Sequence, residues 1–314
     1  MTMGKAMREI YGQALADYGA PNERVVVLDA DLSSSSKTSV FGAAAPERLL
    51  NVGIAEANMA AMAAGLASCG FIPFVNTFAA LADSICYLCA KAMIAYSNLN
   101  VRIVGSNNGL GGGYDGSTHH ATDDLSVMRN IPGMLVITPS DAVMARWMVK
   151  TLIYEYTGPA YLSMERHGGD DIYADDSRMR LGKAIRLTEG EDLSIFACGL
   201  SVGRALKAAE ILHRDGINAQ VYDMFTIKPL DRQTVIDSSA HTGRVLTVEE
   251  HSIIGGLGTA VLETIAENGI CAKVRRIGIR DCYTESGSYE QLVEKYGLGI
   301  DAIVSEAREL MEGE

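Results

Sequence analysis

The sequence predicts an α/β protein built of two three-layer α/β/α domains. Short apolar runs, typical of buried parallel strands, alternate with helical segments along most of the chain. With 314 residues the chain is long enough for two domains of ordinary size, each with its own core. A polar, aperiodic stretch at 168–180 interrupts the alternation, so we expect a first domain at 1–180 and a second at 181–314.

The first half of the chain alternates helices and strands. A helix is predicted at 7–18, a buried strand at 25–29, and at 31–36 a polar loop whose serines are also typical of a helix N-cap. Residues 55–68 are mostly Ala, Met, Gly and Leu, which favours a closely packed helix that is apolar on every side. The elements expected after it are a strand at 71–77, a helix at 79–97, strands at 101–105 and 134–138, a capped helix ending near 156, and a strand at 158–166.

The second half resumes the same alternation after the linker. Strands are predicted at 193–198, 219–224, 244–248 and 274–277, and helices at 203–215, 256–268, 288–296 and 300–311. This spacing favours a second sheet that is mainly parallel. The glycine-rich turn at 255–258 lacks the spacing of a dinucleotide-binding loop, so we expect this half to serve as a scaffold and a subunit contact.

Composition argues against several classes of function. The net charge of −12 disfavours nucleic acid or an anionic membrane surface as the main partner. The sequence shows neither a signal peptide nor an apolar stretch long enough for a membrane span, so we expect a cytoplasmic location. The six cysteines are scattered through apolar segments, which favours reduced core thiols. Cys86 and Cys89 form a C-x-x-C pair, but no second pair of ligands stands at zinc spacing.

Glu56 is the one ionisable residue of the apolar helix at 55–68. An unpaired carboxylate in apolar surroundings is costly, so this side chain should be exposed, bonded to a partner, or protonated and able to donate a hydrogen bond. A solvated glutamate at a helix start, where acidic residues are favoured, is the simplest of these alternatives.

The glycine-rich loop at 106–120 is a second candidate for a site. Its glycines allow the backbone to approach a ligand closely, and Asp115, His119 and His120 add polar side chains within one turn. Adjacent histidines usually point apart, and no further ligand stands at a useful spacing, so a metal site is not expected in this chain.

Arg166 and Arg8 are candidates for binding an anion. Arg166 lies near the end of the strand at 158–166, and its guanidinium offers a planar set of donors that suits phosphate or sulfonate. The alternative for Arg166 is a surface ion pair with Glu165 or Asp170. The alternative for Arg8 is an exposed charge on the first helix.

The segment that ends in Glu56, the small-residue helix after it and Thr77-Phe78 together resemble the pyrimidine site of the transketolase family. That family includes deoxyxylulose-phosphate synthase and two-subunit transketolases. The resemblance implies that Glu56 bonds a pyrimidine nitrogen of thiamine diphosphate and activates the cofactor, while Phe78 stacks on the pyrimidine ring. A carboxyl group in an apolar wall tends to keep its proton, which agrees with this role.

The resemblance also covers the rest of the chain. The string from Asp115 through His119 matches positions that contact substrate hydroxyl and carbonyl groups in the family, and an imidazole can carry a proton in such chemistry. Asp31 matches a position that faces the cofactor cavity. The residues implied to bind the substrate's phosphate are Arg8, Ser35 and Arg166. The first domain would be a thiamine-diphosphate-binding pyrimidine domain, and the second, with its Glu-Glu-His-Ser string at 249–252, a transketolase C-terminal-like domain.

Some positions depart from the family pattern. Asn107 or Asn108 stands where transketolases carry a further histidine, and Ser117 replaces a proline. Leu81 and Ser84 replace aromatic residues that follow the stacking phenylalanine. These changes leave the cofactor chemistry in place and affect the choice of sugar.

No Gly-Asp-Gly, the string that holds magnesium and the diphosphate in full-length transketolases, occurs in this sequence. We therefore expect Mg²⁺ to be bound by an N-terminal partner subunit, in an α2β2 heterotetramer. The predicted function is transfer of a two-carbon ketol unit from a ketose, such as a sugar phosphate, to an aldose. The alternatives are a deoxyxylulose-phosphate synthase-like enzyme, a 2-oxoacid dehydrogenase beta-type subunit, and a non-catalytic assembly partner.

Overall fold

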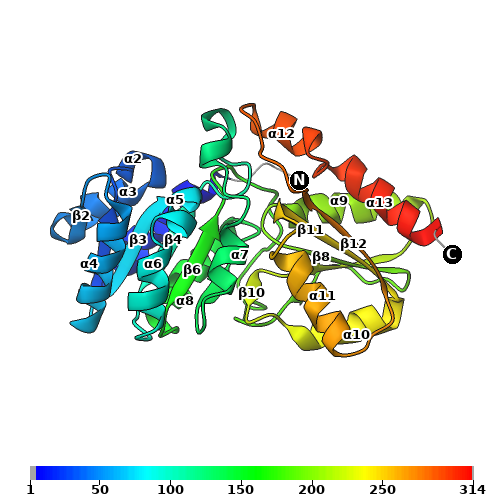
Figure 1. Ribbon diagram of the computed structural model, residues 1–314, viewed down its shortest axis with the longest axis horizontal. Coiled ribbons are helices and arrows are strands. Elements are labelled where there is room, and N and C mark those ends of the chain that lie inside the picture. Colours follow the sequence, from blue (N-terminus) through cyan, green and yellow to red (C-terminus); the bar gives the residue numbers. More distant parts are fainter. Residues whose placement is uncertain (1–4, 313–314) are drawn as a thin grey trace.

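The computed structural model describes residues 5–312. Two α/β/α units lie side by side, with the first half of the chain in one and most of the second half in the other (Figure 1). This arrangement confirms the predicted fold class. Every strand expected from the sequence is present, with ends shifted by a few residues.

Within residues 5–312 the first sheet has seven strands in the order β10-β5-β6-β4-β3-β1-β2. All neighbouring strands are parallel except β10 and β5. The strands are β1 Val25–Asp29, β2 Leu49–Asn51, β3 Ile72–Phe78, β4 Arg102–Ser106, β5 Leu135–Ile137, β6 Ala160–Met164 and β10 Thr226–Lys228. The edge strand β10 comes from the second half of the chain, so the two halves are joined by a shared sheet as well as by a linker.

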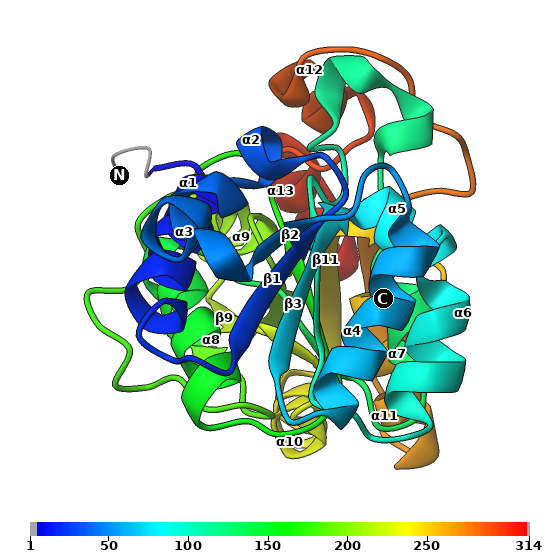
Figure 2. The ribbon, with the colours of Figure 1, turned by 90° about the vertical axis from the view of Figure 1, so that its left-hand side faces the viewer.

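Helices cover both faces of this sheet (Figure 2). One face packs against α1 Met7–Ala14, η1 Leu15–Gly19, α3 Thr38–Ala44 and α8 Ala142–Tyr154. The other packs against α4 Glu56–Ser68, α5 Ala79–Ser84, α6 Tyr87–Cys89, η3 Ala90–Ala95 and α7 Asp124–Arg129. Shorter turns complete the unit: α2 Ser33–Ser36, η2 Pro46–Arg48, η4 Gly113–Asp115 and η5 Ser117–His119.

The prediction of one continuous helix at 79–97 is wrong. The segment divides into α5, α6 and the π-helix η3. The Ser84 hydroxyl donates a hydrogen bond to the Ala80 carbonyl, a bond that competes with the helical ladder and bends helices. The expected loop at 31–36 also contains a short helix, α2, followed by Lys37 in the left-handed region.

The second sheet, within the same described residues, has five strands in the order β12-β11-β8-β9-β7. They are β7 Ile185–Arg186, β8 Leu193–Ala197, β9 Ala219–Asp223, β11 Arg244–Ser252 and β12 Lys273–Ile279, parallel except for β7 with β9. The helices α9 Ser201–Arg214 and α13 Ile300–Glu312 lie on one face, and α10 Arg232–Thr242 and α11 Leu257–Glu267 on the other. The remaining helix is α12 Tyr289–Lys295.

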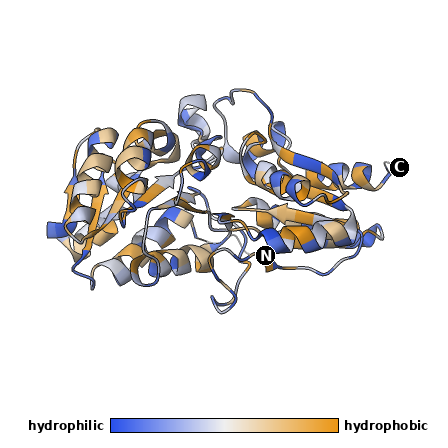
Figure 3. Cartoon of the chain, turned by 60° about the horizontal axis from the view of Figure 1, so that its bottom comes forward, coloured by the Kyte–Doolittle hydropathy of each residue, from blue (hydrophilic) through white to orange (hydrophobic). Residues whose placement is uncertain are grey.

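The apolar core runs from one unit into the other. Met128 and Val136 of the first unit belong to the same buried cluster as Phe196, Tyr222 and Val245 of the second. Figure 3 shows apolar residues concentrated on the strands and on the helix faces that cover them. No helix among residues 5–312 has the length and apolar character needed to cross a membrane. The buried cluster shared by the two units holds them in a fixed relation, which matters for the site at their junction.

The expectation that all six cysteines are core thiols is only half right. Cys86, Cys89 and Cys198 are buried, whereas Cys69, Cys271 and Cys282 are exposed. All six are free thiols in the described part of the chain, so the C-x-x-C pair forms no disulfide.

Candidate active site

The predicted site residues lie at one edge of the first sheet. Strands β1, β2, β3, β4 and β6 are parallel, so their carboxyl ends meet at the same edge. A candidate residue or loop lies at or just after each of these ends. In the order of the strands, these are Asp31, Glu56, Phe78, the 106–120 loop and Arg166.

Glu56 opens helix α4 and is buried, with only 4% of its surface exposed. Its carboxyl group makes no hydrogen bond within residues 5–312, and the preceding Ala55 supplies no side-chain cap. The Cys86 thiol donates to the Glu56 carbonyl oxygen at 3.4 Å. Burial, followed by the nearby Glu56 charge, raises the pKa of Cys86 to about 12. A solvated glutamate at a helix start is therefore the wrong alternative, and a buried carboxyl group is left available to a ligand.

Phe78 and His119 face each other across this edge. Phe78 is the last residue of β3, and His119 ends the short helix η5 in the glycine-rich loop. Their ring centroids are 6.1 Å apart with the rings edge to face at 68°. The Thr118 hydroxyl lies 3.0 Å from Nδ1 of His119. An aromatic surface and a titratable imidazole thus share one wall of the site.

Asp31 and Ser35 lie beyond the end of β1. Asp31 is exposed in the left-handed region, with φ of 63°, and exchanges hydrogen bonds of 3.2 and 3.0 Å with Asn51. Ser35 is half-buried on α2, which packs against α1. Its neighbour Ser36 is the buried serine, and the Ser36 hydroxyl donates to Asp29 at 2.9 Å. Ser35 on α2 and Arg8 on α1 thus lie on neighbouring helices. No hydrogen bond joins their side chains in the described residues.

The structure brings Arg8, Arg166 and Asp115 together. Nη1 of Arg166 lies 3.8 Å from Oδ2 of Asp115. Burial lowers the pKa of Arg8, and the neighbouring Arg166 charge lowers it further. The Arg8 Nε is buried without a hydrogen-bond partner in the described residues. Two adjacent guanidinium groups, one of them with an unused donor, form a suitable cradle for an anion.

The ion pairs considered as alternatives for Arg166 are wrong. Glu165 is buried and turns away from the guanidinium toward His167, whose Nδ1 lies 3.2 Å from the Glu165 carboxylate. Asp170 pairs with Lys207 at 2.7 Å. The Arg166 guanidinium therefore stays at the edge of the site, where Asp115 is its acidic neighbour.

The glycine-rich loop is held from the second unit. The Leu110 N–H donates to Oε1 of Glu250 at 3.0 Å. His120 is buried, with Nδ1 at 2.6 Å from the Thr284 hydroxyl and Nε2 at 3.1 Å from the Gly113 carbonyl oxygen, and burial lowers its pKa. His120 thus fastens the loop while His119 faces the site. No cluster among residues 5–312 has the ligands for a metal ion.

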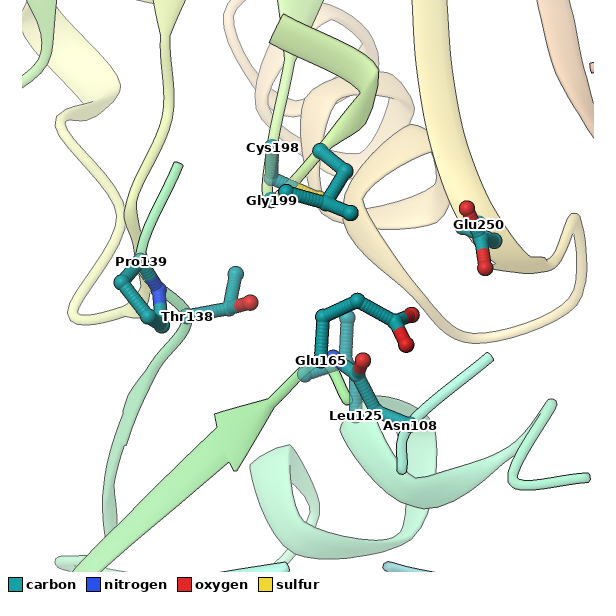
Figure 4. Close-up of a pocket in the computed structure, with 9 residues that line it drawn as sticks. Asn108, Leu125, Thr138, Pro139, Glu165, Cys198, Gly199 and Glu250 are labelled. Atoms are coloured by element: carbon teal, nitrogen blue, oxygen red, sulfur yellow. The ribbon is translucent and has the colours of Figure 1, made fainter. Parts of the chain in front are cut away.

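Sequence reasoning missed two carboxylates at the junction of the two units. Glu165 and Glu250 line a cavity of about 20 Å³, room for about one water molecule (Figure 4). Its other walls include Asn108, Leu125, Thr138 and Cys198. The signal available in the sequence was the string Glu165-Arg166-His167, three ionisable residues directly after a buried strand. Glu250 comes from another part of the chain and could be placed here only by the fold.

Comparison with known proteins agrees with this geometry. The transketolase pyrimidine-binding domain model matches residues 3–169, and the transketolase C-terminal domain model matches residues 182–303. A Methanocaldococcus jannaschii protein named for the C-terminal section of transketolase is 43% identical, over 99% of this chain and 98% of its own. A 6-deoxy-6-sulfo-D-fructose transketolase subunit from a Clostridium species is 41% identical, over 98% of this chain and 94% of its own. A split-gene transketolase, solved as an inactive beta4 tetramer, is 42% identical with a TM-score of 0.88 over 98% of both chains. This chain therefore belongs to the transketolase family.

Proposed function

We propose that this chain is the C-terminal subunit of a two-subunit transketolase, which transfers a two-carbon ketol unit from a ketose to an aldose. The observation that carries the proposal is the buried Glu56 carboxyl group, which has no hydrogen-bond partner among residues 5–312 and lies at the same sheet edge as Phe78, His119 and the arginine cradle. The relatives that match this chain over nearly their whole length are named as a transketolase section or subunit, which supports the subunit form.

The residues present fit the pyrimidine end of thiamine diphosphate. Glu56 would hold a proton at a pyrimidine nitrogen, Phe78 would cover the ring face, and Asp31 would face the cofactor cavity. Bound thiamine diphosphate supplies the carbon nucleophile that takes the two-carbon unit. The described residues offer no metal-binding cluster for the diphosphate end. We infer that Mg²⁺ and the diphosphate are held by an N-terminal partner subunit. The assembly would be a cytoplasmic α2β2 heterotetramer. Within this chain the boundary between the two domains would lie near residue 180.

The substrate side of the site would select an anionic sugar. His119 would move a proton at the sugar carbonyl, and Asp115 would accept hydrogen bonds from its hydroxyl groups. Arg8 and Arg166, helped by Ser35, would bind the distant phosphate or sulfonate group. The name of the Clostridium relative, which includes a sulfonated sugar, supports an anionic substrate of this kind.

The isolated chain is expected to bind thiamine diphosphate weakly, because the ligands for magnesium and diphosphate lie on the partner. Titration calorimetry with Mg²⁺ should show little heat for this chain alone. Adding a short chain that carries Gly-Asp-Gly, from a neighbouring reading frame, should restore magnesium-dependent binding and ketol transfer. Tight magnesium-dependent binding to this chain alone would contradict the two-subunit proposal.

A further inference from the structure

We propose that His167 is a third cationic group of the anion site, held beside Arg8 and Arg166 by the buried carboxylate of Glu165. The inference rests on the proposed function for the identity of the anion. The arrangement of the residues around His167 stands independently of that function, because it is given by contacts within this chain.

Glu165 fixes the orientation of the His167 ring. Oε1 of Glu165 accepts the Arg166 N–H at 2.6 Å and the His167 N–H at 3.4 Å, and it lies 3.2 Å from Nδ1 of the His167 ring. An oxygen that accepts from two backbone groups acts as an acceptor toward the ring as well, so Nδ1 carries a hydrogen and donates it. The second ring nitrogen, Nε2, makes no hydrogen bond among residues 5–312, and 36% of the side chain is exposed. A ligand can therefore reach the ring.

The backbone places His167 next to both arginines. His167 follows Arg166 directly, and its carbonyl oxygen accepts the N–H of Met7, the residue before Arg8, at 3.1 Å. The end of β6 and the first turn of α1 are thus tied together at this histidine. Gly111 also packs against Glu165, since a Cβ at Gly111 would lie 2.1 Å from Oε1. One buried carboxylate therefore supports Arg166, His167 and the glycine-rich loop.

The second unit holds the ring from its other side. The His167 ring stacks on Tyr289 of α12, with centroids 4.4 Å apart and planes at 25°. The Tyr289 hydroxyl donates to Oε2 of Glu250 at 2.7 Å, and Arg204 of α9 donates to the same oxygen at 2.8 Å. These contacts leave the ring little freedom to turn. They also give the second unit a direct part in the substrate site.

The charges around His167 favour its protonated form. The hydrogen bond to Glu165 raises the pKa of His167 most, Glu250 raises it further, and burial and Arg166 oppose the rise. Two further ionisable groups lie around the ring. Tyr289 stacks on it, and Arg204 donates a hydrogen bond to Glu250. The net direction is upward, so His167 keeps its proton to a higher pH than a free imidazole does. Burial also raises the pKa of its partner Glu165, to about 7. Anion binding should be strongest below the raised pKa of His167 and weaken as the pH rises through it.

The test uses inorganic phosphate as the probe and this full chain as the protein, because the three cationic residues all lie in it. The imidazole of His167 is followed by NMR while the pH is varied, with and without phosphate. We expect phosphate to raise the pKa of His167. We also expect His167→Gln to weaken phosphate binding about tenfold, the loss of one charge-assisted contact at a partly exposed site.

His241→Gln is the matched control. His241 is also partly exposed, and its Nε2 lies 2.6 Å from Glu191 on a distant face, so phosphate binding should stay unchanged. Glu165→Gln tests the positioning role: it should lower the pKa of His167 and weaken phosphate binding while the fold remains. Wild-type phosphate affinity in His167→Gln, or a pKa of His167 that ignores phosphate, would overturn the inference.

Kinetics of the two-subunit enzyme separate this inference from the proposed function. His167→Gln should raise KM for a sugar phosphate, leave kcat nearly unchanged, and leave the use of uncharged glycolaldehyde unaltered. It should also remove the pH dependence of KM near the His167 pKa. If the wild-type two-subunit enzyme shows no ketol transfer, the proposed function is refuted. If the enzyme is active but KM for the sugar phosphate has the same pH dependence in wild type and His167→Gln, the role of His167 is refuted.

Discussion

Glu56→Gln is expected to lower kcat by about 10²–10⁴-fold, the range typical for loss of a group that transfers a proton. The amide keeps the size of the side chain but cannot give up and regain a proton. Glu56 is 4% exposed and makes no hydrogen bond in the described residues, so the change removes no internal bond. Thermal unfolding of the variant should match wild type. The measurement is steady-state kinetics of the chain reconstituted with its partner.

Glu249→Gln gives a matched control for this experiment. Glu249 is also buried near a helix start, but its oxygens accept the N–H groups of Leu257 and Gly258 at 2.6 and 2.8 Å. The amide can replace only part of this acceptor set, so the variant should melt at a lower temperature. Its kcat should stay close to that of wild type, because Glu249 bonds the start of α11 and not the residues at the edge of the first sheet. Near-normal turnover by Glu56→Gln would remove Glu56 from the activating role.

The strongest local patterns were read correctly from the sequence. The helix at 56–68 is recognisable because its small apolar residues leave one carboxyl group, Glu56, without an obvious purpose. The strands that lead to Phe78 and Arg166 are short buried runs, and parallel pairing then brings their carboxyl ends to one edge. The gathering of candidate residues at that edge thus follows from strand direction alone.

What the sequence could not give depends on contacts between distant segments. The strand β10 has only three residues, Thr226–Lys228, too few for a periodic pattern, and it forms by pairing with β5. Helix α10 was missed because its buried positions include Ser238 and Ser239, so it has no continuous apolar stripe. These are cases in which tertiary packing decides the local structure.

The same limit applied within the site. An ion pair between Glu165 and Arg166 at the surface was one alternative to anion binding by Arg166, because adjacent opposite charges suggest such a pair. In the folded chain the Glu165 carboxylate lines the junction between the units, whereas the Arg166 guanidinium lies 3.8 Å from Asp115. Only the folded chain brings Glu250, Tyr289 and Arg204 to the other side of that junction.

Arg166→Ala is expected to reduce kcat/KM for an anionic sugar by about tenfold to a hundredfold. Hydrogen bonds to a charged group contribute roughly 1.5–3 kcal/mol, and about 1.4 kcal/mol corresponds to a factor of ten. The Arg166 side chain is 36% exposed, so solvent screening places the loss toward the lower end of this range. An uncharged acceptor such as glycolaldehyde does not reach the guanidinium. Its kcat/KM should therefore change little.

The control for Arg166 is Arg146→Ala. Arg146 lies on helix α8, is similarly exposed at 41%, and pairs with Asp17 of η1 at 2.7 Å. It should leave both substrates unaffected. Arg166→Lys keeps the charge but loses the planar pair of donors, so it should fall between wild type and Arg166→Ala for the anionic sugar. An equal loss on both substrates would mean that Arg166 supports the loop through Asp115 instead of binding the anion. No loss on either substrate would leave Arg8 and His167 as the anion-binding groups of the site.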